Sequence, residues 1–332
     1  MHEDLVPPES IEGVNDKEMA RWKSEYDVVS TLWNMGHDVQ PLGMSDSLSV
    51  VREAIEKWRP HVAFNLLEEF HGVAVYDHHV VSYLELMRQP YTGCNPRGLM
   101  LAHDKSLSKQ ILTYHRIRTP RFAVFPRGRR VKRPKRLDFP LLVKSAIEDA
   151  SMGISQASVV TNDQKLAERV EFIHEQVHSD AIAEQYIEGR ELYVGVLGNQ
   201  RLQTLPVWEM LFTQLPEGVP RIATARVKFD IDYQQKCGIV TKEAQDLPPE
   251  KAQEIATLCK RVYRALSMSG YGRMDLRLDP QGRVYVLEAN PNPNLEYGED
   301  FAESAERAGI SYEALLQRIL NLGLRYKAAW RG

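Results

Sequence analysis

Cysteine is scarce in this chain of 332 residues, which contains only three, at positions 94, 237 and 259. Their odd number and wide spacing exclude a disulfide framework and a cysteine-rich zinc site. Long apolar runs are missing too, since none approaches the roughly 20 residues of a membrane-spanning helix. The opening MHEDLVPPES also lacks the basic and apolar parts of a secretory signal. We therefore expect a soluble protein of the reducing cytoplasm with no membrane partner.

An excess of charge of either sign is absent as well. The formal net charge is -3, and 43% apolar with 26% charged residues is ordinary for a globular protein. This balance indicates neither nucleic acid nor membrane as the main partner. The one strongly basic run, RGRRVKRPKR at residues 127–136, is typical of a solvated loop, and attraction of an acidic or polyphosphate ligand stays open as the alternative.

The most informative segment is residues 271–294, which reads as a β-hairpin. Two alternating runs flank Asp279-Pro280-Gln281-Gly282, where Pro at the second and Gly at the fourth position suit a type I turn. If Leu278 faces Arg283, the register places Asp275 opposite Val286 and Arg273 opposite Glu288. Period 2 then predicts a polar face of Arg273, Asp275, Glu288 and Asn290, and an apolar face of Met274, Leu276, Tyr285, Leu287 and Ala289.

The polar face of this hairpin has the chemistry of a metal and phosphate site. Two carboxylates and an amide oxygen are hard ligands for Mg²⁺, and an arginine supplies a fixed cation for a phosphate or an oxyanion. A solvated face with cross-strand ion pairs is the alternative interpretation. The rigid polar segment NPNPN at residues 290–294 favours a site, because it contributes little to the stability of a fold and is better explained as the wall of a binding site.

Strand and helix patterns alternate along the rest of the chain. We expect helices over residues 15–35, 47–58 and 76–87, with parallel strands near residues 37–42 and 61–67 and a strand stub at Tyr91. Helices at 97–102, 105–115 and 162–177 and strands at 121–125, 139–144, 154–160, 181–187 and 191–198 follow. Three α/β subdomains, residues 1–95, 96–185 and 186–332, account for a length that exceeds one hydrophobic core.

The ordered set of motifs resembles a known family. It comprises Asp104-Lys105, Lys144, Glu184-Gln185-Tyr186-Ile187, Glu191, Gly272-Arg273-Met274-Asp275 and Leu287-Glu288-Ala289-Asn290, preceded by Phe64-Asn65-Leu66-Leu67 and Pro90-Tyr91-Thr92-Gly93. In this order the motifs look like those of ATP-grasp enzymes, and most like those of D-alanine-D-alanine ligases. The resemblance covers nearly the whole chain, and it implies an α/β ATP-grasp fold with ATP between the central and C-terminal subdomains.

The resemblance also implies roles for individual residues. Lys105 and Lys144 would bind the ATP phosphates, and the segment Glu184, Gln185, Tyr186 and Ile187 would hold adenine. Glu191 would accept a ribose hydroxyl, and Lys228 matches a loop lysine near the terminal phosphate. In the phosphate loop Ser151 is retained as a catalytic residue, while Ala150 replaces one of the family's serines. Residues 208–228 are a candidate lid, with an ordinary long loop as the alternative.

A carboxylate–amine ligase follows as the expected activity. An amine does not displace hydroxide from a carboxylate, so ATP must first convert the carboxylate to an acyl phosphate. We expect two Mg²⁺ or Mn²⁺ ions on Asp275, Glu288 and Asn290, and Arg273 as the oxyanion donor. A phosphotransferase and a non-catalytic nucleotide-binding module are the alternatives.

The substrate positions depart from the D-alanine-D-alanine ligase pattern. The family's glutamate before the first helix has no clear counterpart, with Glu9 or Glu12 as substitutes, and Pro291-Asn292-Pro293-Asn294-Leu295 replaces a glycine-containing turn. We therefore expect an amino acid or small peptide as substrate, without strict preference for D-alanine. The candidate substrate contacts are Glu68, His71, Asn292 and Asn294.

The N-terminal helix lacks the parallel strand that should precede it. Its large apolar residues, Trp22, Tyr26 and Trp33, need a sheet to cover, and a sheet short of one strand exposes unpaired backbone groups along its edge. We therefore expect either an upstream strand of about 5 to 6 residues or an edge closed by a neighbouring subunit, as in a homodimer.

Overall fold

The computed structural model describes residues 1–11, 13–15, 19–147, 154–216, 218–224, 226–227 and 230–331. It is a mixed α/β protein with two antiparallel sheets, one of four strands and one of six. Within this part of the chain no helix is long and apolar enough to cross a membrane. Ser151 and Lys228, together with Ala150 and Glu12, lie outside the described residues.

The N-terminal region is mainly helical. It contains the short turns Glu3–Leu5 and Ala74–Tyr76 and the helices α2 (Lys23–Asn34), α3 (Ser49–Trp58) and α4 (Asp77–Leu86). The expected parallel strands at 37–42 and 61–67 are wrong. Residues 37–42 form no strand or bridge, residues 61–67 form a single parallel bridge, Ala63 with Tyr91, and the one parallel bridge near the first stretch joins His2 to Met44. Proline at position 90 has no N–H to donate, and the Thr92 hydroxyl replaces a backbone acceptor for the Asn65 N–H, so the ladder stops after one bridge.

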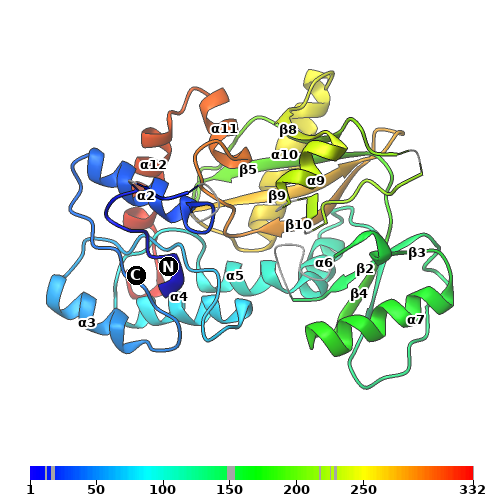
Figure 1. Ribbon diagram of the computed structural model, residues 1–332, viewed down its shortest axis with the longest axis horizontal. Helices are drawn as coiled ribbons and strands as arrows, with labels where there is room; N and C mark the ends of the chain where they lie inside the picture. Colours follow the sequence, from blue (N-terminus) through cyan, green and yellow to red (C-terminus); the bar gives the residue numbers. More distant parts are fainter. Residues whose placement is uncertain are drawn as a thin grey trace.

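The central region holds the small sheet. Its strands are β1 (Phe122–Phe125), β2 (Leu141–Ser145), β3 (Val159–Val160) and β4 (Ala181–Gln185), in the order β1-β4-β2-β3. Helix α7 (Asp163–Phe172), continued by a π-helical turn (Ile173–Val177), lies along this sheet and buries Leu166 and Val170 in its core (Figure 1). The strand expected at 154–160 is mostly absent, since residues 156–158 form a 3-10 turn capped by Ser155.

The large sheet belongs to the C-terminal region. It contains β5 (Arg190–Leu197), β6 (Gln203–Thr204), β7 (Trp208–Phe212), β8 (Ile239–Glu243), β9 (Tyr271–Leu278) and β10 (Val284–Asn290). The order is β10-β9-β5-β7-β8, with β6 paired to β5. The helices of this region are α9 (Ile231–Cys237), α10 (Pro249–Ala265), α11 (Asp300–Arg307) and α12 (Tyr312–Arg325), followed by the turn Ala329–Arg331. The start of the candidate lid is therefore a sheet strand, β7.

Two helices of the middle sequence join the core of the large sheet. Helix α5 (Pro96–His103) contributes Leu99, and α6 (Lys105–Tyr114) contributes Leu112, to the cluster that contains Met274, Leu276 and Val262. Burial of each such side chain stabilises the fold by roughly 1.5–3 kcal/mol. Helix α6 is thereby anchored beside β10 (Figure 1). The division at 95/96 and 185/186 stays a prediction.

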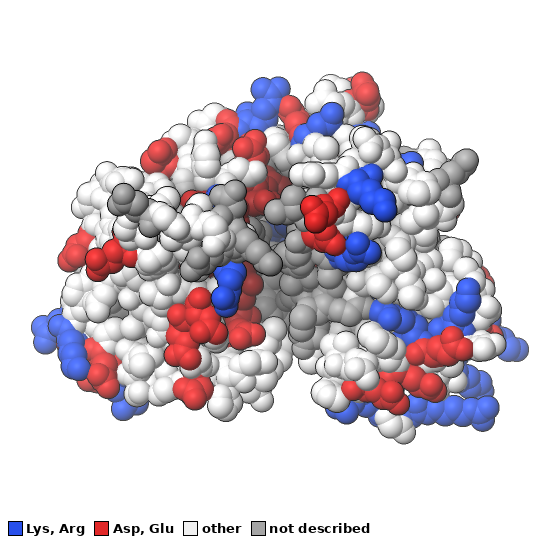
Figure 2. All heavy atoms as spheres, viewed as in Figure 1, with Lys and Arg blue, Asp and Glu red and all other residues white. Residues whose placement is uncertain are grey.

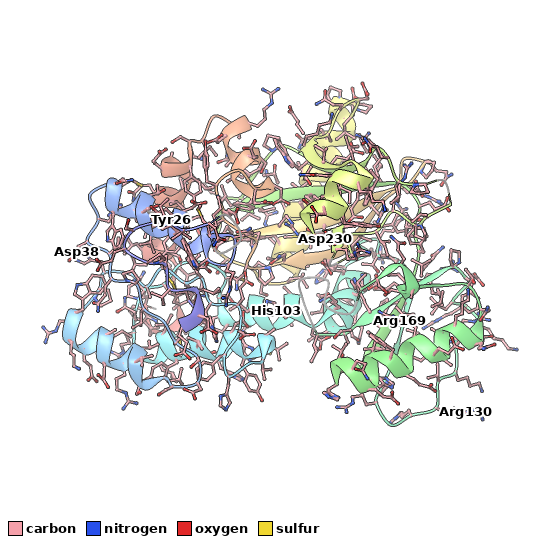
Figure 3. All side chains as sticks on the ribbon, viewed as in Figure 1. Tyr26, Asp38, His103, Arg130, Arg169 and Asp230 are labelled. Carbon is pink, nitrogen blue, oxygen red and sulfur yellow. The ribbon has the colours of Figure 1, made fainter. Side chains whose placement is uncertain are left out.

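The basic run 127–136 is a surface loop after β1. Most of its residues are exposed, and Arg133 pairs with Asp163 at 2.7 Å while stacking on Phe139. Arg130 lies at the outer margin of the small-sheet region (Figure 3), and acidic side chains are interspersed with the basic ones on this part of the surface (Figure 2). This arrangement agrees with the solvated-loop interpretation.

Candidate active site

The hairpin of β9 and β10 has a different register from the one predicted. Leu278 pairs with Val284 instead of Arg283, because the Asp279 side chain accepts from the N–H groups of Gln281 and Arg283 and widens the turn by one residue. The register then shifts again between Val286 and Glu288, where Leu287 is an extra residue on β10. The hairpin itself is confirmed, while the predicted pairs of Asp275 with Val286 and of Arg273 with Glu288 are wrong.

The two shifts bring the acidic groups directly opposite each other. Glu288 pairs with Asp275, and Asn290 pairs with Arg273. Tyr285 was predicted on the apolar face, but it lies opposite Arg277 on the polar face. Val286 occupies the apolar face instead and is fully buried in the core. The polar set of Arg273, Asp275, Glu288 and Asn290 therefore keeps one face, with a closer carboxylate pair than the uniform alternation implied.

The donor set of this face fits a divalent cation that is shared with phosphates. Asp275 is buried, Glu288 is half-buried, and the Asn290 amide oxygen accepts the Asn292 N–H at 2.9 Å, which leaves it a second lone pair. Among the described residues no three His, Cys, Asp or Glu side chains form a metal cluster. A site of two carboxylates and one amide suits Mg²⁺, which usually takes its remaining ligands from water and nucleotide phosphates.

Arg273 is held by two carboxylates. Its guanidinium donates to both oxygens of Asp275, at 2.8 and 2.9 Å, and to Asp300 at the start of α11, at 3.0 Å. It also stacks on the Tyr193 ring, 4.8 Å from the centroid. Burial alone would lower the pKa of Arg273, but Asp275 and Asp300 raise it well above its usual range. The cation is therefore permanent and its plane is fixed beside the predicted metal ligands.

A chain of alternating charges connects the two sheets. The Lys144 Nζ atom on β2 lies 3.3 Å from Glu184 on β4 and 3.4 Å from Glu288 on β10. Glu184 also pairs with Lys109 of α6 at 3.2 Å. Burial opposes the charge on Lys144, but Glu184 and Glu288 outweigh it and raise the Lys144 pKa. Lys105, buried at the first turn of α6, donates its N–H to the Ala146 carbonyl and so lies near the end of β2.

Two of the predicted nucleotide residues, Tyr186 and Glu191, line a large cavity between the two sheets. This cavity has a volume of about 1020 Å³, and its lining includes Tyr186, Glu191, Met210, Arg221 and Arg277. The Glu191 carboxylate accepts from Arg277 at 2.6 Å and from the Tyr193 hydroxyl at 2.9 Å. Asp275 and Glu288 do not line the cavity, but Asp275 is two residues from Arg277 on the same face of β9.

The segment expected to hold adenine runs from β4 into this cavity. Glu184 and Ile187 are buried, whereas Gln185 and Tyr186 are half-buried. The N–H groups of Gln185 and Tyr186 donate to the carbonyls of Arg121 and Pro140. Backbone hydrogen bonds to adenine would therefore have to come from other backbone groups of residues 184–187. Tyr186 also accepts the Arg221 N–H through its hydroxyl.

A second, small cavity brings together three of the four predicted substrate residues. Its lining includes Glu68, Asn292 and Asn294 with Glu25, Asn65 and Tyr271. The Asn292 amide reaches Asp77 at 3.4 Å and the Leu67 carbonyl at 3.5 Å. His71 is not part of this cavity: it is exposed, with φ +59°, and its N–H donates to Ser45.

Sequence reasoning missed Glu25, Lys109, Tyr193 and Arg277. Glu25 is 7% exposed, and burial raises its pKa, whereas Glu9, one of the expected substitutes, is exposed. The signal for Glu25 was a charged residue on the apolar face that Val29 and Leu32 of α2 share with Trp22, the residue before the helix, at helical spacing. Lys109 follows Lys105 by four residues and shares its helix face, which was the corresponding signal there.

Comparisons with known proteins agree with these observations. The protein-family model described as the D-ala D-ala ligase C-terminus matches residues 111–321. The chain is 33% identical over 246 residues to a D-alanine–D-alanine ligase of Bordetella petrii, covering 72% of this chain and 69% of that protein. It is 32% identical over 298 residues to the ligase of the same name from Syntrophotalea carbinolica, covering 88% of each.

The fold also matches a solved structure. The crystal structure of D-alanine–D-alanine ligase from Bacillus anthracis complexed with ATP superposes with a TM-score of 0.73. The two sequences are 24% identical, and the match covers 94% of this chain and 95% of the other. At this identity the similarity concerns the fold.

Proposed function

The chain belongs to the D-alanine–D-alanine ligase family, and we propose that it is an ATP-dependent ligase that joins an amino acid or small peptide to an amine through an acyl phosphate. The observation that carries this proposal is the pairing of Asp275 with Glu288 beside two cations, Arg273 and Lys144. Phosphoryl transfer depends on positioning and charge neutralisation, which such a face provides.

Asp275, Glu288 and Asn290 would hold two Mg²⁺ or Mn²⁺ ions, with Glu288 as the shared ligand. Bound there, the ions would neutralise the nucleotide phosphates during transfer. The contact of Lys144 with Glu288 supports this arrangement. Glu288 is half-buried, whereas Lys109, Glu184 and Lys144 are buried, so Glu288 is the member of the charge chain that a ligand can reach. A phosphate group would compete with Glu288 for the lysine, and a cation would compensate the carboxylate thus released.

The cations of the site would act at two different steps of the reaction, phosphoryl transfer and attack by the amine. Lys105 and Lys144 would follow charge onto the leaving ADP, because flexible ammonium groups adapt to moving phosphates. Arg273, held rigidly by Asp275 and Asp300, would stabilise the oxyanion that forms when the amine attacks the acyl phosphate. The amine loses a proton as the C–N bond forms, and inorganic phosphate leaves.

The large cavity supports binding of the nucleoside. Residues 184–187 would contact adenine, and Glu191 would accept from a ribose hydroxyl with a lone pair that Arg277 and Tyr193 do not use. Arg277 then keeps the Glu191 carboxylate oriented. The cavity and the metal face share strand β9, so base and phosphates would lie along one strand.

The small cavity supports a proposal for how the first substrate binds. Its described lining contains two carboxylates, Glu25 and Glu68, and no lysine or arginine, which suits a substrate ammonium group. Tyr271 lines this cavity and lies two residues from Arg273 on the same face of β9. An α-amino acid with its ammonium group in the cavity would direct its carboxylate toward Arg273. A cytoplasmic location, a homodimer and the absence of nucleic-acid partners stay predictions.

Screening amino-acid pairs for amine-dependent phosphate release, with mass spectrometry of the products, tests this function. A ligase releases one phosphate for each amide bond formed. A phosphorylated product without an amide would instead identify a phosphotransferase. ATP binding without turnover for every pair, in protein that binds Mn²⁺ with nucleotide, would contradict the ligase assignment.

A further inference from the structure

Lys109 is a fully buried lysine to which the proposed mechanism gives no task. It lies in the middle of α6, is 1% exposed, and burial lowers its pKa against the opposing effect of Glu184. Its Nζ atom donates to the Leu287 carbonyl at 2.6 Å and lies 3.2 Å from the second oxygen of Glu184. Burying an ammonium group is costly unless such partners compensate it, so these two contacts explain how the lysine is tolerated.

The carbonyl that Lys109 binds belongs to the extra residue of β10. A bulge leaves one residue without a partner in the ladder, and at this position Leu287 is that residue. The neighbouring N–H of Val286 donates at 2.9 Å to the Arg118 carbonyl, in the segment that follows α6. Two contacts from the sequence around α6 thus hold the outer edge of β10 where its register changes.

The position of the bulge determines which residue faces Asp275. With the bulge at Leu287, the residue opposite Asp275 is Glu288. A continuous ladder beyond Val286 would instead bring Leu287 opposite Asp275 and turn Glu288 to the other face, because a shift of one residue exchanges the faces of a strand. Whatever fixes the bulge therefore fixes the carboxylate pair.

We propose that Lys109 is a positioning residue that holds the bulge at Leu287 and thereby sets Glu288 opposite Asp275 in the geometry that binds a divalent cation. This inference rests on the proposed metal and nucleotide site. Lys109 acts a second time through Glu184, whose two oxygens it shares with Lys144. Without Lys109, Glu184 would draw Lys144 toward itself and away from Glu288.

The test measures binding of Mn²⁺ to the whole protein in the presence of a non-hydrolysable ATP analogue, by electron paramagnetic resonance. Lys109→Met keeps the length of the side chain and removes its donors and charge. We expect it to weaken Mn²⁺ binding by about 10- to 100-fold, the usual cost of losing a residue that orients a metal ligand. Circular dichroism and thermal unfolding establish that the variant is folded at the temperature of measurement.

A matched control contacts the same helix from α10. Arg261 donates to the His115 carbonyl at 3.1 Å, at the C-terminal end of α6, and is exposed. Arg261→Met also removes a cation that anchors α6 through a carbonyl, but it touches neither β10 nor Glu184. We expect its Mn²⁺ affinity to equal that of the unsubstituted protein.

The outcomes separate this inference from the function on which it rests. Unchanged Mn²⁺ affinity in folded Lys109→Met, with loss in Glu288→Gln, would overturn the role of Lys109 and leave the metal site standing. Unchanged affinity in Glu288→Gln would instead remove the metal site itself. If Lys109→Met does not fold, the double variant Lys109→Gln/Glu184→Gln is measured in its place, because it removes both charges of the buried pair. Full Mn²⁺ affinity of this double variant would contradict the proposal.

Discussion

Glu288 lies directly opposite Asp275 because Leu287 occupies one extra position on β10. Two carboxylates facing each other across neighbouring strands repel in the absence of cations, and here Lys144 and Arg273 compensate one carboxylate each. Such a pair has little structural benefit of its own. The pair can accept the positive charge of a bound cation, and this property supports the metal site that we propose there.

The two members of this pair should respond differently to substitution. Glu288→Gln should reduce turnover by about 10²-fold or more, because metal stabilisation of the transition state is worth several kcal/mol. Its stability should change little, since Glu288 is half-buried. Asp275→Ala should in addition lower the free energy of unfolding by about 3–5 kcal/mol, as expected when a buried ion pair loses one member. Phosphate release and urea unfolding measure the two effects, and normal release by Glu288→Gln would remove it from the site.

Arg273→Lys separates chemistry from nucleotide binding. Lysine keeps the charge but cannot contact Asp275 through two parallel bonds and Asp300 through a third. We expect amide formation to fall by about 10²-fold, the typical cost of an oxyanion donor, with ATP affinity little changed. Steady-state kinetics and equilibrium nucleotide binding provide the comparison. An equal decrease in both would make Arg273 a phosphate ligand instead.

Tyr193 connects the two ends of the proposed ATP site. Its hydroxyl donates to Glu191 at 2.9 Å, and its ring supports the Arg273 guanidinium. Tyr193→Phe should raise the KM for ATP by about tenfold, from the loss of a hydrogen bond to a charged group worth roughly 1.5 kcal/mol, and leave kcat unchanged. Tyr193→Leu should lower kcat as well, because the ring is lost. Identical kinetics for the two variants would show that the ring has no part in positioning Arg273.

Glu25 should make stability depend on pH. Burial raises its pKa in the folded state above the ordinary value of 4.5, so the folded protein binds the proton more tightly than the unfolded chain. Its favourable contribution is fully present below pH 4.5 and is lost as the pH rises through the folded pKa. Glu25→Gln should therefore be more stable than the unsubstituted protein at neutral pH, with the difference shrinking in acid.

The same variant tests the substrate assignment. If Glu25 receives the substrate ammonium group, Glu25→Gln should raise the KM for the first amino acid and leave ATP binding unchanged. Urea unfolding at several pH values and initial-rate kinetics supply the two readouts. A KM equal to that of the unsubstituted protein would leave Glu25 as a buried structural acid.

Some features of the protein could be predicted because they depend on short stretches of sequence. Alternation over residues 271–278 is sufficient to indicate strand β9, and the stripes of α3, α4 and α7 predict those helices closely. The parallel N-terminal strands were predicted wrongly because a strand needs a partner, and the partner near Tyr91 offers one bridge beside a proline. Ser151 and Lys228 lie outside the described residues, so their roles stay predictions.

The sequence by itself determined that Arg273, Asp275, Glu288 and Asn290 share one face of the hairpin, because alternation along a strand is largely a local property. Only the tertiary structure decided which of them meet. The carbonyl of Leu287 is bound by Lys109, 178 residues away in the chain, and Glu191 is held by Arg277 across 86 residues. Such contacts set a register and a carboxylate's orientation, and they exist only after distant segments have packed together.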